Sequence, residues 1–316
     1  MQDGSTDHHR MSSVRELRGH IRKDFQLLIS GTAPIFLFSA MLALGFIAAY
    51  SASIDFSQDY DYYSSMHYFD VDELFAEKIL YYWNLLLSIW PLIVTIVVAA
   101  SISQEKENGM LQYILTYRPR SHLVYFSKLT TLSAIFIMVI LSSAAIFQTV
   151  FFFMNGRFIP GDDLFGSCIY PIFAIIILVQ LCILVALLIK KKGAGLIATV
   201  CIVLSLFAVS TLLTSTGIDE MMDRSSDAPG HGMDPDYFPA IYKWFIVLNP
   251  IFLKEGIVSV LGLSIDYQSG IFVQGHFQVL GPGWYFGYIA ISMILYSFVS
   301  IGVIHYNVPR RVRYNG

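Results

Sequence analysis

Six long runs of apolar residues, nearly free of charge, dominate this chain of 316 residues. A helix needs about 20 apolar residues to cross the roughly 30 Å core of a bilayer, because its backbone hydrogen bonds must be satisfied within the helix. Overall, 55% of the residues are hydrophobic and 14% are charged, whereas a soluble domain carries about a quarter charged residues. The expected spans are residues 33–53, 79–101, 129–154, 167–189, 194–214 and 284–305. The sequence therefore predicts an all-α protein with six transmembrane helices.

The charges between these spans predict the orientation of the chain. Fifteen of the 20 Lys and Arg residues, but only 6 of the 23 acidic residues, lie in segments 1–32, 101–128, 190–193 and 306–316. Basic residues are enriched in cytoplasmic loops, so we expect a multi-pass protein of the cell (plasma) membrane with both termini in the cytoplasm. The net charge of −3 gives no overall basic surface for nucleic acid.

This topology divides the chain into three parts. Residues 1–32 form a cytoplasmic N-terminus, residues 33–305 a transmembrane domain, and residues 306–316 a basic cytoplasmic tail. The transmembrane domain includes a large outer loop, 215–283, and within it an apolar segment, 241–263, that contains Lys254 and Glu255. Each of these charges would cost roughly 2.5–3.5 kcal/mol at the centre of a spanning helix. We therefore expect a re-entrant or interfacial helical segment there instead of a seventh span.

The N-terminus is predicted to form an amphipathic helix. Apolar residues recur at spacings of three and four, at Val14, Leu17, Ile21, Phe25 and Leu28. Basic residues lie between them, at Arg15, Arg18, Arg22 and Lys23. Such a helix can lie on the anionic cytoplasmic surface of a membrane; a cytoplasmic helix packed on its neighbours is the alternative. Membrane lipid is thus one expected partner.

The segment between the second and third spans, 101–128, is the most informative part of the sequence. Glu105 and Glu107 form a charged end to the second span, and Gly109 can stop that helix. One apolar stripe follows, at Met110, Leu111, Ile114 and Leu115. Pro119 ends this short helix near Tyr117. Two helical turns are not stable alone, so the stripe needs a partner surface.

These residues resemble the hallmark of type-2 ATP-binding-cassette (ABC) exporter permeases. That pattern runs from a Glu-Lys-Glu triplet through glycine and an apolar stripe to a proline and a lysine; here the lysine is Lys128, and Met110 replaces the usual threonine. Asn249 and Pro250 are similar to the branch of the family associated with copper-enzyme maturation. The resemblance implies that Met110–Tyr117 is a cytoplasmic coupling helix, with Glu105 and Glu107 beside it, which docks on a separate ATPase subunit.

The resemblance also defines the expected partners. The chain has no Gly-x-x-x-x-Gly-Lys-Ser/Thr phosphate-binding loop, so we expect no enzymatic activity and no cofactor on this chain, with ATP and Mg on the partner ATPase. A second permease chain, identical or different, is needed to enclose a transport pathway. The expected function is that of a transmembrane permease subunit, with export as the direction; the sequence does not identify the substrate.

Other polar residues have simpler interpretations. Met221, Met222, His231 and Met233 lie in the outer loop, and their thioether and imidazole groups suit copper, although a solvated polar loop explains them equally well. Asn84, Gln148 and Gln180 within spans are expected to hydrogen-bond neighbouring helices rather than substrate. Tyr60, Tyr62, Tyr63 and Tyr68 are typical of an interfacial aromatic belt.

Three other functions were weighed. A secondary transporter should carry charges within its spans and inverted repeats, and a membrane hydrolase should carry His-Glu-x-x-His or Gly-x-Ser-x-Gly; neither set of features occurs. A non-transporting scaffold for an ATPase-driven assembly or maturation machine remains as an alternative.

Overall fold

The computed structural model describes residues 4–64, 71–109, 121–189, 193–226, 257 and 282–307. In these ranges every regular element is an α-helix, which confirms the all-α prediction for this part of the chain. The helices are α1 (Gly4–Ser30), α2 (Thr32–Tyr63), α3 (Val71–Glu107), α5 (Ser121–Asn155), α6 (Gly161–Ser167), α7 (Ile169–Leu188), α8 (Ala194–Ser226) and α11 (Pro282–Asn307).

Within the described ranges, five helices are long and apolar enough to cross a membrane, so this is a multi-pass membrane protein. They fall on α2, α3, α5, the nearly continuous pair α6 and α7, and α11. Most extend beyond the expected spans, because the polar residues that flank each apolar run continue its helix. The fifth expected span falls on α8, whose described apolar stretch, Ala194–Val209, is shorter than the others. The six-span count therefore stays a prediction.

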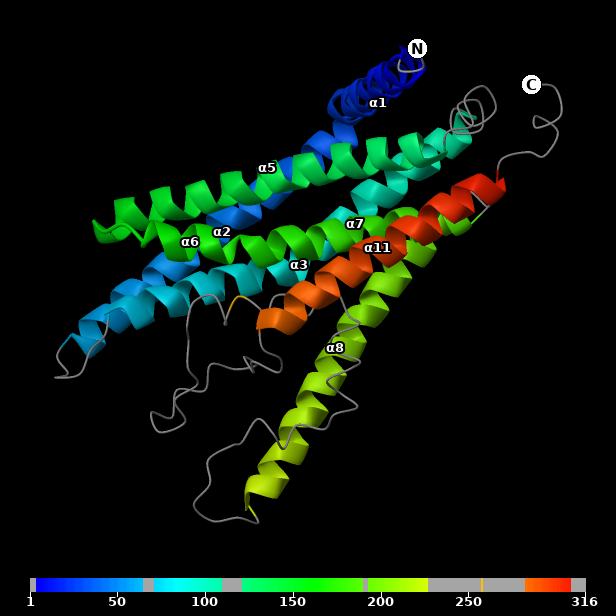
Figure 1. Cartoon of the computed structure of the whole chain (residues 1–316). Coiled ribbons are helices and arrows are strands. Elements are labelled where there is room, and N and C mark those ends of the chain that lie inside the picture. The colour runs from blue at the N-terminus through cyan, green and yellow to red at the C-terminus, as the bar shows by residue number, and fades with distance from the viewer. Residues whose placement is uncertain are drawn as a thin grey trace.

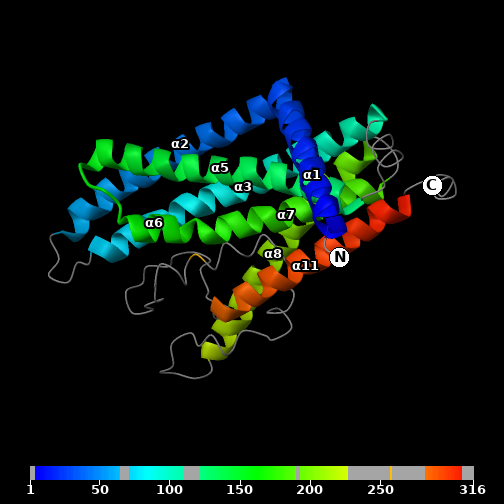
Figure 2. The ribbon, with the colours of Figure 1, turned by 45° about the horizontal axis from the view of Figure 1, so that its top comes forward.

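The long helices α2, α3, α5 and α7 run side by side as an up-and-down bundle (Figures 1 and 2). Helix α2 packs against α5 and α3, and α7 packs against α3, α5 and α11. Helix α8 contacts α3 and α7 and then diverges from the bundle (Figure 1). It remains helical to Ser226, past the expected end at residue 214, so the first part of the predicted outer loop is helical.

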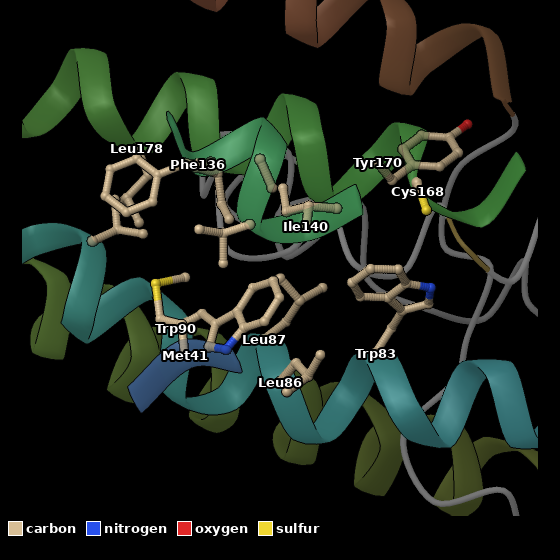
Figure 3. Close-up of a cluster of buried hydrophobic side chains, with 14 of the residues drawn as sticks. Met41, Trp83, Leu86, Leu87, Trp90, Phe136, Ile140, Cys168, Tyr170 and Leu178 are labelled. Carbon is tan, nitrogen blue, oxygen red and sulfur yellow. The ribbon is translucent and has the colours of Figure 1, made fainter. Parts of the chain in front are cut away.

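The centre of the bundle is filled by large apolar and aromatic side chains. Figure 3 shows Trp83, Leu86 and Trp90 of α3 facing Phe136 and Ile140 of α5. Both tryptophans and Phe136 are fully buried. Aromatic rings of this size bury 150–250 Å² each. Large side chains of α3 and α5, the two helices that flank segment 110–120, therefore meet in the core, while α3 itself packs on α2 and α7.

Several serine and threonine hydroxyls in the spans bond within their own helix. Ser53 donates to the carbonyl of Ala49 at 2.7 Å, and Thr199 donates to that of Gly195 at 2.6 Å. Thr95 donates to the carbonyl of Pro91, the proline inside α3, at 2.6 Å. Such bonds satisfy the hydroxyls where water is absent. Pro91 lies inside one continuous helix of 37 residues.

We call one end of the bundle the basic end. It holds the start of α2, the end of α3, the start of α5, the end of α7, the start of α8 and the end of α11 (Figure 1). Helix α1 crosses the bundle there, packed on α5 and joined to α2 by a bend (Figure 2). The bend lies at Gly31, whose φ of −80° and ψ of 126° are extended.

Candidate coupling site at the basic end

The last turn of α3 directs three consecutive charged residues in three directions. Successive residues of an α-helix point about 100° apart. Glu105 is buried against α1 and α5, Lys106 is half-buried and reaches α7, and Glu107 is exposed. The Glu-Lys-Glu triplet thus connects α3 to its neighbours on two sides and presents one carboxylate on the surface.

Glu105 belongs to a buried cluster of charges that we call the inner ion cluster, formed by Lys23, Asp24, Glu105 and Lys128. Lys128 of α5 forms an ion pair with Glu105 and lies 3.8 Å from Asp24 of α1. Lys23 lies 3.2 Å from Asp24 and 3.8 Å from Glu105. Ser127 donates to Asp24 at 2.5 Å. Two positive and two negative groups are thus balanced, with Asp24, Glu105 and Lys128 buried and Lys23 partly exposed at the edge of the cluster.

The inner ion cluster is costly to disrupt because three of its four charged groups are buried. Asp24, Glu105 and Lys128 are 7%, 7% and 5% exposed. Desolvating charges is costly, and their attraction offsets that cost only when each has partners at short range. The arrangement of three helices meets that requirement. It therefore holds α1, α3 and α5 in one register at the basic end.

Lys106 caps the end of α7. Its ammonium group donates to the carbonyl oxygens of Ala186, Leu187 and Ile189, the last two at 3.3 and 2.9 Å. The final carbonyls of a helix have no partner within the helix, and a cation there also interacts favourably with the helix dipole. Lys106 thus joins the ends of α3 and α7.

Gly109 closes the turn that follows α3. Its φ of +66° lies in the left-handed region that glycine adopts without strain. Its N–H donates to the carbonyl of Lys106 at 3.3 Å. The predicted helix stop at Gly109 is therefore confirmed. Met110, Leu111, Ile114 and Leu115 lie outside the described residues.

Sequence reasoning found Glu105, Lys106 and Lys128 but not the role of α1. Asp24 and Lys23 lie about 80 residues before Glu105, and no local pattern links them. The available signal was an acidic residue, Asp24, next to the apolar position Phe25 of an amphipathic helix whose polar residues are mostly basic. Asp24 lies on the same side of α1 as the buried Leu28.

Of the polar residues predicted to join helices, Gln180 does so, whereas Gln148 bonds the loop that follows its own helix. Gln148 donates to the carbonyl of Ile159 at 3.0 Å. Gln180 of α7 donates to Ser297 of α11 at 3.2 Å, and the Tyr125 hydroxyl also lies 3.2 Å from Ser297. The contacts of Ser297 therefore join α11 to α7 and α5, and the contact of Gln148 holds the loop between α5 and α6.

The other candidates give no metal site in the described part of the chain. Met221 and Met222 lie within α8, and His231 and Met233 lie outside the described residues. No group of three or more His, Cys, Asp or Glu residues suited to a metal occurs among the described residues.

The far end of the bundle is joined by charged and aromatic groups. Lys78 of α3 is buried and pairs with Asp59 of α2. Arg157 donates to the Tyr60 hydroxyl at 2.6 Å, and its guanidinium carbon lies 4.3 Å from the centre of that ring. Tyr60 of the predicted aromatic belt therefore has a structural contact.

A helical multi-pass membrane protein with a charged turn leading into segment 110–120 has the features expected of a transporter subunit. A family model described as "ABC-2 family transporter protein" matches residues 22–211, from α1 into α8. The match covers more than half of the chain, so the chain belongs to the ABC-2 transporter family. A comparison with curated proteins gave no match.

Proposed function

We propose that this chain is the permease subunit of an ABC exporter that moves its substrate with energy from ATP hydrolysed by a separate subunit. Membership of the ABC-2 family supports a permease, and the absence of a phosphate-binding loop in the sequence supports a separate ATPase. One observation carries the proposal. The two helices that flank segment 110–120 are joined by the buried pair of Glu105 and Lys128, so that segment emerges from a fixed base.

In this proposal segment Met110–Tyr117 is the coupling helix. Met110, Leu111, Ile114 and Leu115 would fill a groove of the ATPase, and Glu107, exposed at the end of α3, would lie beside that groove. Binding of ATP and Mg by the partner would move the segment and shift the permease between two states. Such a shift requires that the partner contacts the two states with different affinity.

The membrane arrangement completes the proposal. We place the basic end of the bundle, with both termini, on the cytoplasmic side of the plasma membrane, and α8 as a sixth span. The exposed Arg15, Arg18 and Arg22 of α1 would face anionic headgroups.

A second permease chain, identical or different, would complete the transport pathway. Large apolar side chains of α11 are exposed, including Ile291 at 68% and Phe298 at 75%. A surface of this kind suits lipid or another span. The described helices pack around their own core, so a pathway for substrate requires a second chain.

The test is co-purification with the ATPase encoded beside this chain's gene. Leu111→Asp and Ile114→Asp should abolish complex formation and the ATPase activity that depends on it. Thr116→Asp is the matched control, since at about 100° per residue position 116 lies opposite the centre of the apolar stripe on a helix, and it should retain both. If the two stripe variants bind and stimulate the ATPase like the unmodified chain, the proposed docking role is wrong.

A further inference from the structure

We propose that the last turn of α3 is a fork that transmits motion of segment 110–120 along two separate routes. The first route runs through Glu105 to α1 and α5, and the second runs through Lys106 to α7. This inference rests on the proposed function, because it concerns where motion imposed by an ATPase goes inside the permease. Glu105 and Lys106 are then positioning residues, and α1 is part of the moving unit.

The first route consists of direct contacts between charged groups close to segment 110–120. Glu105 precedes the start of segment 110–120 by five residues, and it is held by Lys128 of α5 and faces Lys23 of α1 at 3.8 Å. Asp24 completes the link, since it faces both lysines and accepts from Ser127 at 2.5 Å. A displacement of α3 that kept these charges paired must carry α1 and α5 with it. Separation would leave unpaired charges in a buried site.

The second route uses a different kind of contact. Lys106 donates to three main-chain carbonyls at the end of α7. Main-chain atoms of a helix end are fixed by the helix itself, so the contact acts on α7 as a unit. Helix α7 in turn packs on α11, and Gln180 bonds Ser297 there. The second route therefore leads to α11, which α5 of the first route also contacts through the Tyr125 hydroxyl, 3.2 Å from Ser297, so α1 and α7 are the helices that distinguish the two routes.

The two routes can be separated because neighbouring residues form them. Glu105→Gln removes the charge that faces Lys128 and Lys23 and leaves Lys106 in place. Lys106→Met removes the donor to α7 and leaves the inner ion cluster in place. Glu73→Gln is the matched control, since Glu73 is an exposed glutamate in the first turn of the same helix, at the far end.

The experiment is hydrogen–deuterium exchange of the permease–ATPase complex in nanodiscs, with and without a non-hydrolysable ATP analogue. In the unmodified complex, nucleotide should change the protection of segment 110–120, of α1 and of the last turn of α7. Glu105→Gln should abolish the change in α1 and keep the change in α7. Lys106→Met should do the reverse, and Glu73→Gln should keep both changes.

Several results would overturn the fork. These are a response in α1 or α7 that is the same in all variants, a response lost from both helices in either variant, or a response of segment 110–120 that reaches neither helix. No nucleotide response in segment 110–120 itself would instead refute the proposed function. Glu105→Gln combined with Lys128→Met tests the first route without an unpaired buried charge, since it removes one charge of each sign. It should assemble with the ATPase and lack the α1 response.

Discussion

Glu105 on α3 and Lys128 on α5 form a buried ion pair between the two helices that flank segment 110–120. The pair explains why a charged triplet and a lysine 23 residues apart occur together in one sequence. Its contribution can be measured by removing one charge and then both.

Lys128→Met alone should destabilise the protein by about 3–5 kcal/mol, because it leaves Glu105 and Asp24 buried without their shared partner. Glu105→Gln with Lys128→Met should cost clearly less than the sum of the single changes, since Lys23 and Asp24 remain paired. Unfolding in detergent, followed by tryptophan fluorescence, gives the stability of the unmodified protein, of each single variant and of the double variant. Additive effects would show that the two residues do not interact.

Gly45 permits the close approach of α2 and α5. A Cβ at this position would lie 2.1 Å from Ser143 Oγ, and Ser143 is held 2.5 Å from the Tyr82 hydroxyl. Gly45→Ala should therefore destabilise the protein by about 1–3 kcal/mol, and Ser143→Ala should recover part of the loss. Gly302→Ala, where nothing lies within 4 Å of the new Cβ, is the control and should be neutral or stabilising by up to about 1 kcal/mol. Thermal unfolding of the purified variants compares them; equal effects at both glycines would contradict the close contact.

Ser167 should contribute more to the stability of the protein than its small side chain suggests. It accepts a hydrogen bond from the buried indole of Trp83 at 2.8 Å and donates to the carbonyl of Leu164 at 2.7 Å. Ser167→Ala leaves the indole N–H without its acceptor and should cost about 1–3 kcal/mol. Ser205→Ala, at an exposed serine that bonds within its own helix, should change stability by less than about 0.5 kcal/mol. Thermal unfolding of the purified variants measures both effects. If Ser167→Ala does not lower stability, the hydrogen bond from Trp83 to Ser167 is not important for the fold.

The proposed orientation can be tested by cysteine labelling. Cys201 is the exposed native cysteine of the described residues, so Cys201→Ser provides the background. Arg18→Cys, at the basic end, should react with a membrane-impermeant maleimide only after cells are opened. Gln58→Cys, exposed at the far end, should react on intact cells. The opposite pattern would reverse the orientation.

The arginines of α1 should give the N-terminal helix its affinity for anionic lipid. Each basic residue near an anionic surface contributes about 1 kcal/mol. Replacing Arg15, Arg18 and Arg22 by Gln in a peptide of residues 4–30 should weaken its partition into vesicles containing anionic lipid by about 100-fold. Vesicles of zwitterionic lipid are the control and should show little difference. Equal binding of both peptides to anionic vesicles would remove the electrostatic part of the proposal.

The sequence alone determined the helical class, the spans that became α2, α3, α5, α7 and α11, and the stop at Gly109. These features depend on the length of an apolar run and on local backbone preference, which neighbouring residues in the chain carry by themselves. The charge bias between spans likewise needed no structure to produce a prediction of orientation.

Only the tertiary structure decided what the charged residues contact. Glu105 was predicted beside a partner surface, yet it is buried with Lys128 and faces Lys23 of α1. Lys106 was one charge in a triplet, yet it caps α7. These pairings join residues about 20 to 80 positions apart. They exist because the packing of the apolar cores brings helix ends together, and no local pattern specifies which ends meet.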